Sequence, residues 1–156
     1  MSTNYGKRFE DKFKDDWKIC FPQSFILRLP DQMSGYKYTS SNLCDFICFN
    51  KDTLFLIELK SHNGASIPLD NITQYDKLVK KVGIQGVRTG VVLWLYKKDR
   101  VFYIPISTIT KLKEDGEKSV GIRHLGKYNI IEIPSVKKRV YMDSDYSILT
   151  ALKDGE

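Results

Sequence analysis

The stretch CDFICFNKDTLFLIELK, residues 44–60, consists of two apolar runs separated by a short polar turn. Runs rich in Phe, Ile and Leu on either side of such a turn predict a β-hairpin, with strands over 44–49 and 53–59. Strands that are apolar at nearly every position are covered on both faces, so helices must pack on both sides of the sheet. The stretch therefore predicts an α/β fold with a buried central sheet.

The flanking sequence supplies helices and further strands for this sheet. Aromatic residues recur every four positions over 4–18, which predicts a helix with Asn4 as its N-cap. A second helix is expected over 68–82, because proline suits a first turn and an apolar stripe ends at a glycine. Shorter helices are expected over 108–117 and 144–152, and strands over 24–29, 91–96, 101–106, 130–133 and 140–142. The order is α-β-β-β-α-β-β-α with a tail, in one domain over 1–156.

Length, charge and cysteine content narrow the class of protein. The chain has 156 residues, which is the size of a single domain, and no run of apolar residues is long enough to span a membrane. Three cysteines, an odd number, argue against a disulfide framework and favour a reducing, cytoplasmic location. The net charge of +6 includes +9 in residues 59–140. Such a basic region either binds a polyanion through phosphate contacts or forms ordinary solvated faces.

Charged residues stand at the ends of the two most apolar strands, where burying a carboxylate is costly without a partner. Counted outward from a three-residue turn at 50–52, Asp45 and Glu58 lie within one position of each other, and Lys60 points to the same face as Glu58. Two carboxylates and the backbone carbonyl of Leu59 suit Mg²⁺, and a nearby lysine can orient a water or stabilise a phosphate. The alternative is a strand-end ion pair beside a turn aspartate.

The order of these segments resembles the PD-(D/E)xK nuclease superfamily, with Asp45 followed by the Glu58-Leu59-Lys60 motif after a helix that contains GKRFE at 6–10. The segment SIPLDNI at 66–72 narrows the resemblance to the RecU-like Holliday junction resolvases of Gram-positive bacteria and their phages. The resemblance implies a mixed central β-sheet flanked by helices, with the αβββαβ core of restriction endonucleases.

The resemblance also implies a function. It indicates a Mg²⁺- or Mn²⁺-dependent endonuclease that cuts branched four-way DNA as a homodimer and has no membrane partner. By the resemblance, Asp45 and Glu58 hold the metal, Glu10 contacts it from the first helix, Lys60 serves the attacking water, and Gln74 lies near the site at the start of the covering helix. It also implies a phage-encoded protein acting in the cytoplasm of a bacterial host.

Basic and aromatic residues outside this motif are the candidate DNA contacts. The loop over 31–42 lies where the family carries a segment that enters the junction, so its tyrosines and lysine are expected to contact the branch point. The full candidate set is Lys7, Tyr36, Lys37, Tyr38, Lys80, Lys81, Lys97 and Lys98. Two other functions remain open: a restriction or repair nuclease of the same superfamily, and a non-catalytic nucleic-acid-binding protein on the same fold.

Overall fold

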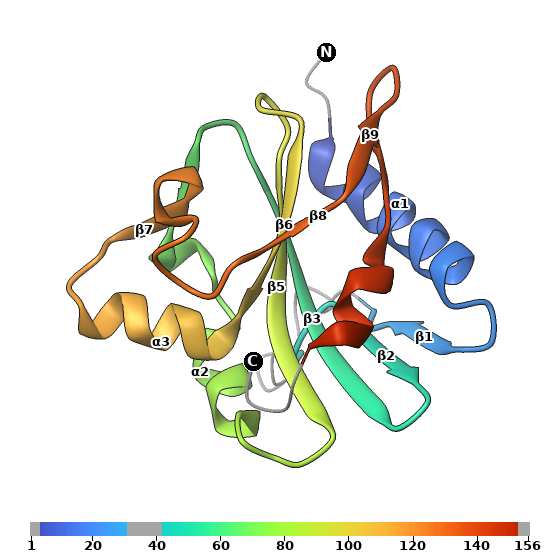
Figure 1. Cartoon of the computed structure of the whole chain (residues 1–156), viewed down its shortest axis with the longest axis horizontal. Coiled ribbons are helices and arrows are strands. Elements are labelled where there is room, and N and C mark those ends of the chain that lie inside the picture. The colour runs from blue at the N-terminus through green and yellow to red at the C-terminus, as the bar shows by residue number, and fades with distance from the viewer. Residues whose placement is uncertain (1–3, 31–41, 153–156) are drawn as a thin grey trace, which may run out of the picture.

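A six-stranded mixed sheet forms the centre of the protein, whose computed structural model describes residues 4–30 and 42–152 (Figure 1). All neighbouring strands are antiparallel except β3 and β5, which are parallel. The strand order is β1 (Phe25–Arg28), β2 (Phe46–Asn50), β3 (Thr53–His62), β5 (Val87–Leu95), β6 (Arg100–Pro105) and β8 (Ile131–Ile133). The expected mixed α/β architecture is therefore confirmed.

A two-residue turn joins β2 and β3. Asn50 pairs with Thr53, so the turn contains only Lys51 and Asp52, and Lys51 adopts a positive φ of 59°. The turn is one residue shorter than the sequence pattern predicts. The regular pairing ends with Phe46 opposite Ile57, and Asp45 donates its N–H to the carbonyl of the same Ile57, so Asp45 lies within one position of Glu58, as the sequence predicts.

Helices cover both faces of the sheet. On one face, α1 (Tyr5–Cys20) buries Phe9, Phe13 and Trp17 against the side chains of β2 and β3 that include Phe46 and Phe55. Asn4 caps this helix as expected, since its side chain accepts a hydrogen bond from the backbone N–H of Lys7. On the other face, α3 (Ile106–Glu114) and the short α2 (Tyr75–Leu78) lie together, as Figure 1 shows.

The single helix expected over 68–82 is wrong. The segment is divided into β4 (Ser66–Pro68), a 3₁₀ turn η1 (Leu69–Asn71), α2 and a second 3₁₀ turn η2 (Val79–Lys81). Pro68 has an extended backbone because β4 pairs with β7 (Ser119–Gly121), a partner that lies far along the chain. The apolar stripe is nevertheless real, since Leu69, Ile72 and Leu78 are all buried.

The C-terminal third also differs in detail from expectation. The helix predicted over 108–117 is α3, which begins and ends a few residues earlier. The strand predicted over 140–142 shares only Met142 with β10 (Met142–Ser144), because Val140 lies in the turn of a hairpin whose other strand, β9 (Ser135–Lys137), escaped prediction. A short 3₁₀ turn η3 (Ile122–His124) precedes β8, and the terminal helix is a 3₁₀ helix, η4 (Tyr146–Ala151).

Among residues 4–30 and 42–152, no helix is long and apolar enough to cross a membrane.

The aromatic layer beneath α1 is expected to supply much of the stability. Phe13 is completely buried and contacts the rings of Trp17, Phe46 and Tyr146. Phe13→Ala should therefore lower the free energy of unfolding by about 3–5 kcal/mol, through lost burial and the cavity left behind. Urea denaturation followed by fluorescence measures this change. The matched substitution Phe25→Ala, at a side chain that is 54% exposed, should change it by no more than about 0.5 kcal/mol. Equal effects would contradict this account of the core.

Candidate active site

The candidate site begins at the end of β2, where Asp45 joins three strands. Its backbone N–H donates to the carbonyl of Ile57 on β3 (3.0 Å), and its carbonyl accepts from the N–H of Leu29, next to β1 (2.9 Å). Its carboxylate Oδ2 accepts from the backbone N–H of Leu59 (2.7 Å). The side chain thus takes the place of the next ladder bond between β2 and β3, which fixes the carboxylate beside the middle of β3.

Glu58 is the most deeply buried acid of the site, with 2% of its surface exposed. Its Oε1 lies 3.4 Å from the hydroxyl of Thr73 and 3.4 Å from the Nζ of Lys60. Its Oε2 is buried and has no hydrogen-bond partner. Burial raises the pKa of this carboxyl, an effect that the charge of Asp45 reinforces and that Lys60 and the backbone amide of Gln74 oppose. An ionised, half-satisfied carboxylate in this place is costly unless a further positive group binds it.

Lys60 and the carbonyl of Leu59 complete the polar groups at this place. Lys60 follows Glu58 on the same face of β3 and keeps 27% of its side chain exposed, so its ammonium group can reach a bound phosphate. Within one residue of a strand, the N–H and C=O groups point to the same side. The carbonyl of Leu59 therefore faces the side on which its N–H meets Asp45.

Glu10 lies on the other side of the sheet, on α1. Its Oε2 binds Arg28 of β1, with distances of 2.8 Å to Nε and 2.7 Å to Nη2. Arg28 precedes Leu29, whose N–H binds the carbonyl of Asp45, so Glu10 sits close to the same end of β2 but across the sheet from Glu58. Over residues 4–30 and 42–152, no three His, Cys, Asp or Glu side chains gather closely enough to hold a metal ion together.

The groups that the structure does bring together fit a hard cation. Mg²⁺ is usually held by one or two carboxylates, with water completing its shell, and it needs no dedicated cage of protein ligands. Asp45 and Glu58 supply two carboxylates across one strand pair, and the partnerless Oε2 of Glu58 is a free ligand atom. The expected Mg²⁺ or Mn²⁺ is therefore chemically compatible with this pair.

The two residues before α2, Thr73 and Gln74, contact Glu58 in a way that the sequence did not predict. Gln74 was expected to point its side chain at the site, but the contact seen here comes from its backbone amide, which hydrogen-bonds the carboxylate of Glu58. Thr73, which sequence reasoning did not select, contributes its hydroxyl. A Thr immediately before a short helix is the type of residue that bonds a nearby acceptor, and this is the signal that could have identified it.

The candidate DNA contacts fall at both ends of the sheet. Lys7 lies in the first turns of α1 and lines an open polar cleft of about 630 Å³ with Glu10 and Arg28. Lys97 and Lys98 form the turn between β5 and β6, beyond the end of β3, since His62 pairs with Leu95. Lys80 and Lys81 lie in η2, near the opposite end, where β5 starts. Tyr36, Lys37 and Tyr38, with most of the loop over 31–42, lie outside the described residues.

The mixed sheet with helices on both faces is a fold shared with a protein of known structure. The chain is similar to the solved structure of Hjc, a Holliday junction resolvase from the hyperthermophilic archaeon Archaeoglobus fulgidus. The match covers 78% of this chain and 93% of that one, with a TM-score of 0.55 and 19% sequence identity. No protein-family model and no curated protein matches the sequence.

The buried carboxylate of Glu58 is expected to lower the stability of the metal-free protein while providing a ligand for a metal ion. Because the pKa of Glu58 is raised, folding binds a proton that the unfolded chain releases at lower pH, so stability falls as pH rises above the ordinary value of 4.5. Glu58→Gln should therefore melt about 2–4 °C higher than wild type at pH 7, the shift that about 1 kcal/mol produces at this size, and the difference should vanish near pH 4. Differential scanning calorimetry at both pH values measures it.

Added Mn²⁺ should raise the melting temperature of the wild type and leave that of Glu58→Gln nearly unchanged, because the variant lacks one of the two carboxylates that would hold the ion. Glu132→Gln is the matched control: Arg100 lowers the pKa of the Glu132 carboxyl, so this variant should not gain stability at pH 7 and should keep the Mn²⁺ response. A Glu58→Gln protein that is less stable than wild type at pH 7 would contradict the prediction.

Proposed function

We propose that this protein is a Mg²⁺- or Mn²⁺-dependent endonuclease that acts on branched DNA and resolves four-way junctions as a homodimer. The observation that carries the proposal is the closeness of Asp45 to Glu58, with Lys60 alongside and a buried carboxylate oxygen of Glu58 without a partner. These groups lie on a fold shared with a Holliday junction resolvase. The basic excess of the chain suits a phosphate-rich substrate.

The chemistry proposed is hydrolysis of one phosphodiester: water adds to phosphorus and one P–O ester bond breaks. Asp45, Glu58 and the carbonyl of Leu59 would hold the cation, which, when bound, acidifies water and polarises the phosphate. Lys60 would orient the attacking water or neutralise charge that develops on the phosphate oxygens. Thr73 and the amide of Gln74 hold Glu58 in place. Glu10 would reach the water shell of the cation only after parting from Arg28.

The proposed homodimer follows from the presence of one candidate site in each chain. Symmetric resolution of a four-way junction needs two cuts, and each chain offers one Asp45–Glu58 pair, so two copies are required. Lys7, Lys97 and Lys98 would contact phosphates and thereby position the DNA without reading its sequence. Lys80 and Lys81 are included in the proposal as contacts to a more distant arm, because they lie at the other end of the sheet.

Asp45→Asn tests the proposal most directly. The amide keeps the size of the side chain but removes a metal ligand, so cleavage of a mobile four-way junction in Mg²⁺ should fall at least about 100-fold. Binding to the uncut junction should persist, because the proposed phosphate contacts lie elsewhere. The measurement maps cuts on all four end-labelled strands, with and without Mg²⁺. Asp52→Asn, in the exposed turn of the same hairpin, is the matched control and should cleave like wild type.

Three outcomes would change the assignment. Equal cleavage by Asp45→Asn and wild type would remove this pair from the chemistry. Strong preference for a site on linear duplex would favour a restriction or repair nuclease. Junction binding with no cleavage in any divalent metal would favour a non-catalytic DNA-binding protein on the same fold.

A further inference from the structure

A short hairpin near the C-terminus projects beyond the sheet, at the end where α1 begins (Figure 1). In it, β9 and β10 pair with Met142 opposite Lys137. The N–H of Lys138 donates to the carbonyl of Tyr141 (2.8 Å), which leaves only Arg139 and Val140 at the tip. The hairpin is therefore a narrow two-stranded ribbon that ends in a tight turn.

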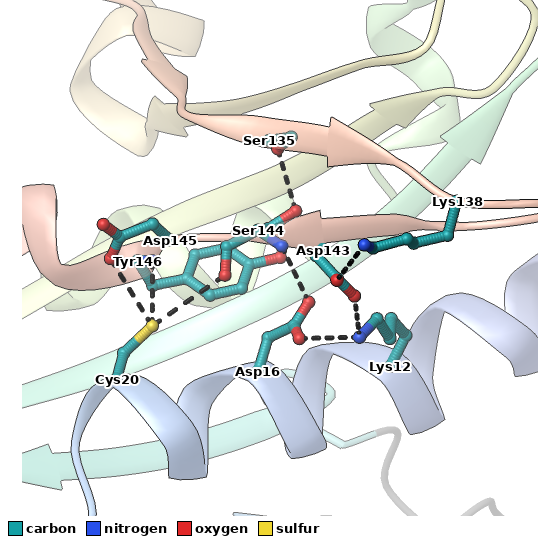
Figure 2. A network of polar contacts seen from close by, with 9 residues as sticks. All are labelled: Lys12, Asp16, Cys20, Ser135, Lys138, Asp143, Ser144, Asp145 and Tyr146. Atoms are coloured by element: carbon teal, nitrogen blue, oxygen red, sulfur yellow. Dashed lines mark hydrogen bonds and ion pairs between the residues drawn. The ribbon is translucent and has the colours of Figure 1, made fainter.

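The base of this hairpin is fastened to α1 by a buried polar network (Figure 2). Asp16, only 4% exposed, accepts from the N–H of Ser144 (3.0 Å) and from the Nζ of Lys12 (2.9 Å). Lys12 also binds Asp143 (2.5 Å), and the hydroxyls of Ser135 and Ser144 share a hydrogen bond (2.9 Å). Detaching the hairpin would leave the Asp16 carboxylate buried without its backbone donor, so the base is held firmly.

The two faces of the hairpin are held as well. On the α1 side, the Nζ of Lys12 lies 4.9 Å from the centre of the Tyr141 ring. On the other side, Lys137 binds Asp99 (2.7 Å), which lies in the same turn as Lys97 and Lys98. The ribbon is thus aligned in advance, and its tip forms one basic rim with the turn between β5 and β6.

The tip exposes cationic side chains together with aliphatic ones. Lys138 and Arg139 are exposed, and the ammonium of Lys138 faces only the half-exposed Asp143 at 3.6 Å. On either side of these cations in the sequence, Val136 is 61% exposed and Val140 is 47% exposed. Cations that bind phosphate and aliphatic groups that pack on sugar, presented on a ribbon narrow enough for a DNA groove, match duplex nucleic acid.

We infer that the tip of the β9–β10 hairpin seats against the sugar-phosphate backbone of a duplex DNA arm, with Lys138 and Arg139 on phosphates. The inference rests on the proposed function in taking DNA as the polyanion. The hairpin contacts the turn at the end of the sheet nearer to Lys60 of the candidate active site. Lys60 pairs with Leu93, two residues before β5 ends at Leu95, so about 7 Å of strand separate it from the turn that holds Lys97, Lys98 and Asp99.

The test compares two double variants with equal charge. Lys138→Gln/Arg139→Gln removes the tip cations, while Lys111→Gln/Lys127→Gln removes two exposed lysines near α3 and after η3, far from the hairpin. Both are made in the Asp45→Asn background, so that binding is measured without cleavage. The ligands are a four-way junction and a linear duplex about two helical turns long, titrated by fluorescence anisotropy at several salt concentrations. Melting temperatures check folding, which the exposed Lys138–Asp143 pair should hardly affect.

The tip variant should bind both DNA ligands about tenfold more weakly at physiological salt. The slope of log affinity against log salt should fall by about two, one unit for each lost phosphate contact. The control variant should keep the parental slope. Parental affinity and slope in the tip variant would overturn the inference, and so would an equal loss in the control, because long-range charge alone would then explain it.

The same binding measurements, together with junction cleavage by the tip variant in a protein that keeps Asp45, separate this inference from the proposed function. Loss of DNA binding in the tip variant of a protein that never cleaves DNA would support the hairpin contact while the nuclease proposal fails. Junction cleavage by a tip variant whose DNA affinity and salt slope equal those of the parent would support the nuclease and overturn the hairpin contact.

Discussion

The hydrogen bond from the N–H of Leu59 to the carboxylate of Asp45 decides where the candidate chemistry can occur. At this point the regular ladder between β2 and β3 ends, and a side chain replaces the next backbone acceptor. The replacement fixes Asp45 beside Glu58 and leaves the carbonyl of Leu59 on the same side. A shift of the strand pairing by one residue would move the side chain of Glu58 to the face covered by α1 and separate the two acids. Catalytic geometry is therefore a consequence of strand register.

That register also explains the electrostatics of the site. Odd-numbered residues of β3 pack under α1, and even-numbered residues face α2 and α3, so Glu58 lies in an apolar layer between Leu56 and the short α2. The layer raises the pKa of Glu58 and leaves one of its oxygens without a donor. The folded protein retains a group that weakens it, which is a usual property of sites built for binding a cation or a substrate. By contrast, Lys60 is two residues further along and reaches solvent.

Local sequence patterns predicted those features that depend on neighbouring residues. The α1 helix and the β2–β3 hairpin follow from periodicity and turn signals, and counting outward from the turn brings Asp45 to within one position of Glu58. The helix expected over 68–82 failed because β4 pairs with β7, a contact between segments about fifty residues apart that no local pattern reveals. The strand β9 escaped prediction for a different reason: it has three residues and little burial, so it carries no apolar alternation. The bond between Glu10 and Arg28 and the contact of Thr73 with Glu58 depend on tertiary placement. Residue type alone therefore could not show that Glu10 pairs with an arginine, or that Thr73 belongs to the site.

The link between α1 and the C-terminal hairpin joins groups 128 residues apart in the sequence. Phe13 and Trp17 are therefore not fully covered until Tyr146 and Leu149 have been made. Until then, the aromatic stripe of α1 lacks part of its cover and Asp16 lacks its backbone donor. Packing of the helix is thus a non-local step that waits for the hairpin, and contacts of such long sequence separation slow folding.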